Sequence, residues 1–189
     1  MVKRAIISWI CLAALIATSS SYAVVSETGK WSETINGIQG RLIVSEDPML
    51  NGTRILAAYV ELRNVSDVMN PLEIYYEPGS MVQCQLRDAT GKPISRADLP
   101  ASIIQPLPFW LTLPHDSSLR FRISVSGYGI PKDARALIPM ADHAWLIKAG
   151  DQNEYALEAT FIARRPKDET HERRVWQGVL KLPKVKIPA

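Results

Sequence analysis

The sequence predicts an all-β fold, with about seven or eight antiparallel strands and at most one short helix. Apolar and polar residues alternate with a period of two in one segment after another, as a sheet with one buried and one solvated face requires. Turn-forming residues separate these segments, and thirteen prolines, all after residue 23, leave little room for a long helix. Two such amphipathic sheets bury their apolar faces against each other. We therefore expect a single immunoglobulin-like β-sandwich, with a closed barrel as the alternative.

Residues 1–23 have the parts of a secretory signal peptide. Lys3 and Arg4 supply a positive start, residues 5–17 form an apolar run, and Ser21-Tyr22-Ala23 is an acceptable cleavage site. The run is shorter than the roughly 20 apolar residues that a membrane-spanning helix needs. We therefore expect an exported protein, periplasmic or extracellular after cleavage, that meets the membrane only transiently through this leader. An uncleaved anchor is the alternative.

The mature part, residues 24–189, has the length of one domain. Removing 23 of the 189 residues leaves 166, which is enough for a substantial core and cramped for two domains. The leader also removes two of the 22 basic side chains, so 20 remain against 19 acidic ones and the net charge is about +1. The densest basic cluster, Arg164–Arg174, is interleaved with acidic residues. We expect a solvated hairpin end there, and no nucleic-acid partner.

The alternation places the strands along this domain in order. Between Arg54 and Asn64 it is unusually apolar, which indicates a central strand partly covered on both sides. Between Leu119 and Val125 it is clearest, with arginines and serines on the solvated face. The expected strands are residues 38–44, 54–64, 72–76, 82–88, 119–125, 145–147, 155–163 and 175–182.

Glycine, asparagine, aspartate and proline punctuate these strands. The expected turns are at residues 51–52, 88–91, 127–129 and 149–151. Pro131 precedes the one helical candidate, residues 132–137, and Pro139 follows it closely. Residues 97–114 contain four prolines but are too apolar for a disordered linker. We expect them to form an ordered extended crossover between strands.

The last strand has a break in its alternation at Pro183. Leu180 and Leu182 share one phase, whereas Val185 and Ile187 are displaced by one residue. We therefore predict a β-bulge or a strand switch at Pro183.

Cys84 is the single cysteine of the mature chain, since Cys11 lies in the leader. One thiol forms no internal disulfide, so the domain relies on its core for stability. Cys84 shares a face with Val82 and Leu86. We expect a buried structural thiol; a reactive or intermolecular cysteine is the alternative.

Candidate catalytic and metal-binding residues form no recognisable motif. His115, His143 and His171 are expected in solvated loops, and neighbours on an extended chain point opposite ways, so His115-Asp116 is not expected to be a preassembled dyad. The chain contains no HExxH, GxSxG or Walker-type pattern, and its acidic stretches match no calcium-loop spacing. We therefore expect no catalytic residue, no metal site and no cofactor.

Aromatic residues are the best candidates for binding. Phe109 and Trp110 lie in the proline-rich crossover, and Tyr75 and Tyr76 lie on an expected edge strand. One ring of each adjacent pair must face away from the other. We assign these four residues as a candidate platform for a sugar ring or a peptide, the alternative being that the tryptophans fill the ends of the sandwich beneath the tyrosines.

Two strings of residues carry a family resemblance. Residues 60–67 (VELRNVSD) with 86–93 (LRDATGKP) resemble a strand pair of secreted bacterial immunoglobulin-like modules, among them the BsuPI-type proteinase-inhibitor domains. With residues 110–114, 125–129 and 176–183 added, the mature chain is similar to uncharacterised exported immunoglobulin-like proteins of planctomycete-type bacteria. This second resemblance implies an exported sandwich and no particular activity. The first maps no reactive-site residue.

The function expected from these observations is that of a secreted, non-catalytic binding or interaction module. Its contacts would be made by loops or an exposed sheet edge, to a protein or glycan in the cell envelope or outside it. Two alternatives remain open: an envelope-associated hydrolase whose site is assembled by the fold, and a proteinase inhibitor.

Overall fold

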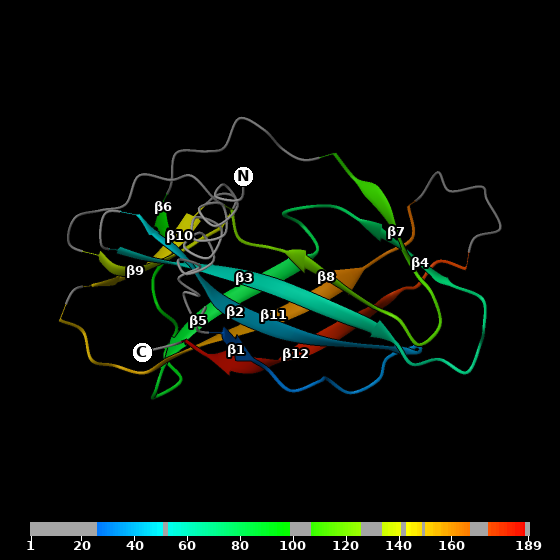
Figure 1. Cartoon of the computed structure of the whole chain (residues 1–189), viewed down its shortest axis with the longest axis horizontal. Coiled ribbons are helices and arrows are strands. Elements are labelled where there is room, and N and C mark those ends of the chain that lie inside the picture. The colour runs from blue at the N-terminus through cyan, green and yellow to red at the C-terminus, as the bar shows by residue number, and fades with distance from the viewer. Residues whose placement is uncertain are drawn as a thin grey trace, which may run out of the picture.

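A computed structural model describes residues 26–50, 53–98, 107–125, 134–140, 143–148, 150–166 and 174–187 (Figure 1). Every regular element in this part of the chain is a strand, which confirms the all-β prediction. The strands are β1 (Ser26–Thr28), β2 (Ile38–Leu50), β3 (Thr53–Asn64), β4 (Leu72–Tyr76), β5 (Val82–Asp88), β6 (Ala97–Asp98), β7 (Phe109–Leu113), β8 (Ser118–Arg122), β9 (Ala134–Pro139), β10 (His143–Lys148), β11 (Tyr155–Ala163) and β12 (Gly178–Lys186).

The strands form three sheets that enclose one core. The largest has seven strands in the order β1-β2-β3-β9-β10-β6, with β8 also paired to β3. The second has the order β12-β11-β5, and the third is the pair β4-β7. Figure 1 shows β2 and β3 in front of β11 and β12. Leu42, Val60 and Leu62 from the large sheet belong to the same buried cluster as Leu86, Phe161 and Leu180 from the second sheet, so the arrangement is that of a β-sandwich.

The long strand β3 is central, as its apolar sequence predicts. It pairs with β2 from Asn64 to Thr53, and on its other side with β8 in one half and β9 in the other. Leu56, Ala57 and Ala58 are all fully buried, so both faces of the strand are covered. The β3-β9 contact is parallel, whereas all the other strand pairings are antiparallel. The immunoglobulin-like connectivity stays a prediction.

Side chains of the facing sheet pack closely against Gly40. A Cβ atom at this position of β2 would lie 2.6 Å from Leu182 Cδ2 on β12. A side chain at this position would therefore require the buried Leu182 side chain to shift, and a glycine avoids that rearrangement.

Most of the expected strands occur, and three of them, β4, β5 and β11, have the expected bounds. The short helix expected at residues 132–137 is wrong, because Ala134–Pro139 is strand β9, paired with β10. Six residues are too few to stabilise a helix by themselves, whereas the strand buries Ala134, Ala136 and Ile138. The described parts of the expected crossover also contain strands, namely β6 and β7.

The bulge predicted at Pro183 is confirmed. Ala159 on β11 pairs with Leu182, but Leu157, two residues earlier, pairs with Val185. Three steps on β12 thus match two steps on β11, which is the definition of a bulge. Leu182 and Val185 are both buried as a result, at 4% and 3% exposure.

The expected signal peptide, residues 1–23, lies outside the described residues, as do the turns at 51–52 and 127–129. In the part of the chain that is described, no helix has the length and hydrophobicity needed to cross a bilayer.

Candidate functional site

The four aromatic residues singled out from the sequence lie together on the β4-β7 sheet. The antiparallel register pairs Tyr75 with Trp110 and Tyr76 with Phe109. The ring centroids are 5.1 Å apart in the first pair and 5.4 Å apart in the second, both with tilted planes. These separations are in the range of favourable aromatic contacts. The small sheet therefore carries an aromatic pair on each of its faces.

The two faces of this sheet have different environments. Tyr76 faces the core, is 6% exposed and contacts Phe121 at a centroid distance of 4.8 Å. Burial raises the pKa of the Tyr76 hydroxyl to about 12. Tyr75 and Trp110 lie on the opposite face and are half-buried. Tyr76 is thus a packing residue and drops out of the candidate site, while its partner Phe109, at the start of β7, is 45% exposed.

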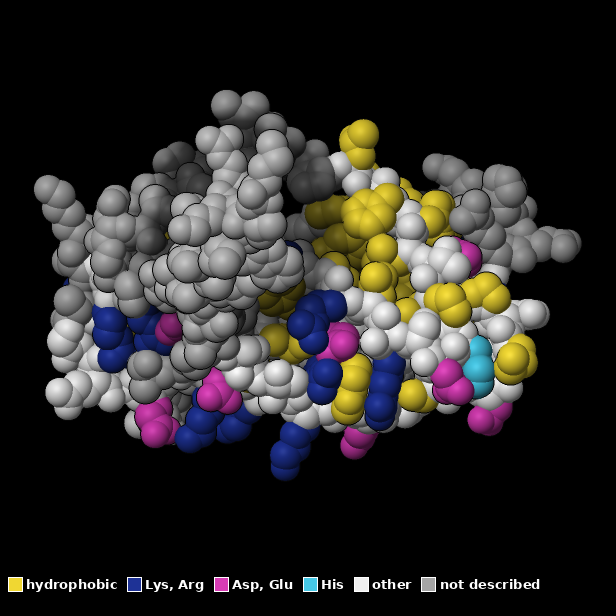
Figure 2. Space-filling view, viewed as in Figure 1, with side chains coloured by type: hydrophobic (Ala, Val, Ile, Leu, Met, Phe, Trp, Pro, Cys, Tyr) yellow, Lys and Arg dark blue, Asp and Glu magenta, His cyan; other side chains and the backbone are white. Residues whose placement is uncertain are grey.

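Exposed apolar side chains lie beside both ends of the small sheet. Leu107, just before β7, is 83% exposed, and Met69, just before β4, is 77% exposed. Figure 2 shows hydrophobic side chains collected over the part of the molecule that contains β7 and β8. We call the surface formed by Leu107, Phe109 and β7 the apolar edge. Exposed clusters of this kind mark interaction surfaces more often than isolated apolar residues do.

Among the described strands, β4 is the one that pairs with β7. Its partner β4 is covered on its other side by the segment before β12, because Glu73 N–H donates to Arg174 O at 3.0 Å and Trp176 N–H donates to Glu73 O at 2.8 Å. No described strand pairs with the outer edge of β7. An edge strand with exposed apolar residues is a template for another extended chain.

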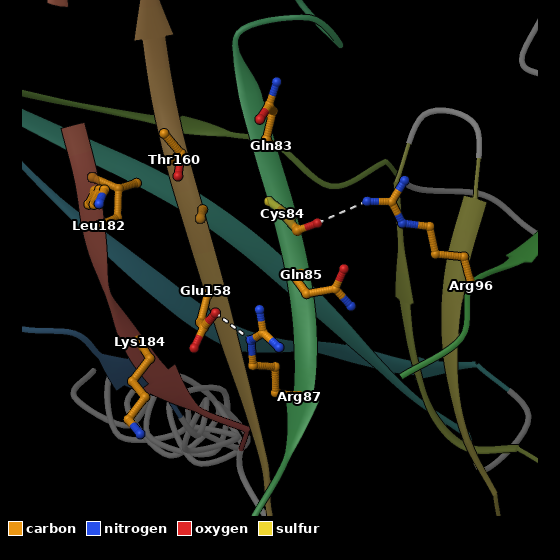
Figure 3. A pocket seen from close by; sticks show the side chains of 11 residues that line it. Gln83, Cys84, Gln85, Arg87, Arg96, Glu158, Thr160, Leu182 and Lys184 are labelled. Carbon is orange, nitrogen blue, oxygen red and sulfur yellow. Dashed lines mark hydrogen bonds and ion pairs between the residues drawn. The ribbon is translucent and has the colours of Figure 1, made fainter. Parts of the chain in front are cut away.

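Two hollows lie over the outer faces of β5 and β11. One, of about 430 Å³, is lined by Tyr75, Gln83, Arg164 and neighbouring residues. The other, of about 520 Å³, lies over β5, β11 and β12 (Figure 3). Gln83 lines both. The larger hollow contains basic residues that no sequence motif marks, because two separate segments contribute them: Arg96 after β5, and Lys181 and Lys184 on β12.

The histidines differ from expectation in two respects. His115 Nε2 lies 3.1 Å from Asp116 Oδ2, so this pair does come together. Asp116 has a φ of 54°, and this left-handed turn brings back a side chain that an extended chain would point away. His143 lies in strand β10 rather than in a loop, while His171 is outside the described residues. Neither His115 nor His143 lines the two hollows, and the described residues contain no group of three or more His, Cys, Asp or Glu able to hold a metal ion.

Cys84 is buried, as predicted, with 6% of its surface exposed. Burial raises the pKa of its thiol to about 12, and the nearby Arg96 opposes this shift only in part. The thiol is therefore protonated at neutral pH. A protonated, enclosed thiol is a poor nucleophile, which favours the structural interpretation.

Searches with this chain found no matching family model, curated protein or solved structure.

Proposed function

We propose that the protein is an exported, non-catalytic binding module that takes an extended segment of a partner protein along the apolar edge. The single observation that supports this most strongly is the outer edge of β7, which no described strand covers and which lies beside the exposed side chains of Phe109 and Leu107. Backbone hydrogen bonds from such an edge supply affinity for any extended chain, and side chains beside it supply selectivity.

The composition of the edge indicates the kind of segment that binds. Phe109, Trp110, Leu111 and Leu113 make four of the five residues of β7 apolar, and Thr112 is the exception. Thr112 Oγ1 already contacts the Glu73 carboxylate at 3.1 Å. A bound strand therefore meets apolar neighbours, and we expect it to alternate apolar with polar residues.

A phage library of random peptides panned on the purified protein tests this proposal. We expect the recovered peptides to alternate apolar residues, and to lose at least tenfold in affinity when Phe109→Asp is introduced. In a peptide bound as a strand, every second backbone N–H group faces the edge of β7. Methylating the nitrogens that face β7 must abolish binding, whereas methylating the nitrogens between them must leave binding intact.

The matched control is Leu146→Asp, a half-buried apolar position on β10 at the far side of the large sheet. Circular dichroism first establishes that both variants are folded. Recovered peptides that bind the Phe109→Asp variant as well as the unchanged protein, or that tolerate methylation on both phases, would exclude the edge of β7 as the site.

A further inference from the structure

The outer face of the β12-β11-β5 sheet is basic, although the mature chain is nearly neutral. Four basic side chains line the larger hollow, which has a volume of about 520 Å³, and Glu158 is the one acidic side chain among its lining residues. Lys181 and Lys184 come from β12, Arg87 from β5 and Arg96 from the segment that follows β5. We call this surface the cationic face.

The charges on this face are not balanced within it. Arg87 Nε lies 2.6 Å from Glu158 Oε2, so this pair is neutral as a unit. Arg96 donates from Nη2 to the Cys84 carbonyl oxygen at 3.1 Å, a contact that fixes the guanidinium and leaves its charge intact. Lys181 and Lys184 are exposed and have no acidic partner among the described residues. Three positive charges therefore face solvent across the sheet.

Neutral hydrogen-bonding side chains lie between these charges. Thr160 lies on β11, with Gln83 and Gln85 on the neighbouring strand β5 (Figure 3). The Gln85 amide is held in place, because its Nε2 donates to Leu86 O at 3.0 Å and to Ile94 O at 3.4 Å. Amide and hydroxyl groups of this kind match sugar hydroxyls, which are both donors and acceptors.

An aromatic ring lies where the cationic face ends. Gln83 belongs to both hollows, and the second hollow continues from it to Tyr75 and Arg164. The Tyr75 ring contacts the ring of Trp110, its cross-strand neighbour, at a centroid distance of 5.1 Å. A ring held in this way offers an apolar surface to the face of a pyranose.

We propose that the cationic face binds an acidic polysaccharide, with carboxylates on its sugar rings. The positive charges complement such a ligand in sign and in spacing. They extend from β12 across β11 and β5 to Arg96, a distance of three strand spacings or about 14 Å. A single sugar does not span that distance, whereas a chain of uronate units presents carboxylates at intervals with hydroxyls between them. The neutral Gln83, Gln85 and Thr160 side chains between the charges favour a ligand with hydroxyl groups between its carboxylates over a nucleic acid.

Binding of polygalacturonate to the purified protein, measured by isothermal titration calorimetry, tests this assignment. We expect Lys181→Gln with Lys184→Gln to weaken binding at least tenfold, and Lys184→Gln alone to weaken it severalfold. Lys148→Gln is the matched control, because Lys148 is an exposed lysine on β10 in the other sheet. We expect it to leave binding within twofold of the unchanged protein.

Three further ligands separate charge from other sources of affinity. Fully methyl-esterified polygalacturonate keeps the sugar chain without its charge, and we expect it not to bind. Single-stranded DNA and vesicles of an anionic phospholipid are expected to bind at least tenfold more weakly than polygalacturonate. The proposal is overturned if polygalacturonate does not bind, if the double variant binds it as well as the unchanged protein, or if DNA or the vesicles bind as tightly. Because Phe109 lies outside the cationic face, Phe109→Asp must leave polygalacturonate binding intact whether or not the apolar edge takes a peptide.

Discussion

The apolar edge and the cationic face present opposite chemistry and are built in opposite ways. The apolar edge contains the adjacent pair Phe109-Trp110, which one strand pairing joins to a second adjacent pair, Tyr75-Tyr76, on β4. The charges of the cationic face come from β5, the segment after it, and β12, with β11 between them. A surface made from neighbouring residues is visible in a sequence. One made from single residues on separate strands becomes visible only when the register of the sheet is known.

The largest expected difference is between the two members of one aromatic pair, Tyr76 and Phe109, truncated separately. Tyr76→Ala empties a core site and should lower the free energy of unfolding by about 3 kcal/mol. Phe109→Ala removes a half-exposed ring and should cost less than about 1 kcal/mol while weakening peptide binding. Urea denaturation followed by fluorescence measures both. Equal losses would mean that the two rings do not differ in burial as described.

The next largest difference is expected in how salt changes ligand affinity at the two surfaces. Raising NaCl from about 0.05 M to about 0.3 M shortens the Debye length to less than half, so polygalacturonate affinity should fall about tenfold. Peptide affinity at the apolar edge should change less than about twofold, because apolar contacts and backbone hydrogen bonds carry it. Titration calorimetry at the two salt concentrations measures both. A peptide affinity that falls in parallel with that of polygalacturonate would place both ligands on the cationic face.

Alkylation of Cys84 tests how deep the cationic face extends. Cys84 lies on β5 between Gln83 and Gln85, yet its thiol faces the core and has a pKa of about 12. At about pH 8 the folded protein should react with iodoacetamide at least a hundredfold more slowly than the same protein in denaturant, because both burial and protonation protect the thiol. Mass spectrometry of timed samples follows the reaction. Rapid labelling of the folded protein would show that the hollow opens to the thiol.

The smallest expected effect is that of Glu158→Gln. The Glu158-Arg87 pair is more than a third exposed, so its loss should change the free energy of unfolding by less than about 1 kcal/mol. Removing the one acidic side chain from the cationic face should nevertheless raise polygalacturonate affinity severalfold and leave peptide binding unchanged. Calorimetry with both ligands provides the measurement, and a decrease in polygalacturonate affinity would contradict the role given to the unpaired charges.

Local sequence patterns were sufficient to predict much of the fold. The phase change between Leu182 and Val185 predicted a bulge correctly, because side-chain direction in a strand depends only on position along it. The helix expected at residues 132–137 was wrong, because Pro131 and Pro139 suggested the two ends of a short helix, whereas pairing with β10 and with the distant strand β3 makes residues 134–139 a strand. Strand β7 was hidden by its flanking prolines, Pro108 and Pro114.

The same limit applies to the candidate sites. Phe109 and Tyr75 stood out because aromatic doublets are rare and must expose one ring. Lys181 and Lys184 did not, because isolated lysines on the solvated face of a strand are ordinary. Their proximity to Arg96 depends on strand order, which no local pattern encodes.

The bulge in β12 has a consequence for how this molecule resists self-association. Strand β12 is the border of its sheet, and it combines a kink, a proline that lacks an N–H, and three outward lysines, all of which discourage a second copy from joining there. Strand β7 has none of these safeguards within its five residues, and only the prolines on either side limit its length. If copies of this chain associate through their sheets, we expect the first intermolecular backbone hydrogen bonds at Phe109–Leu113. A lysine substituted there should reduce aggregation at high protein concentration.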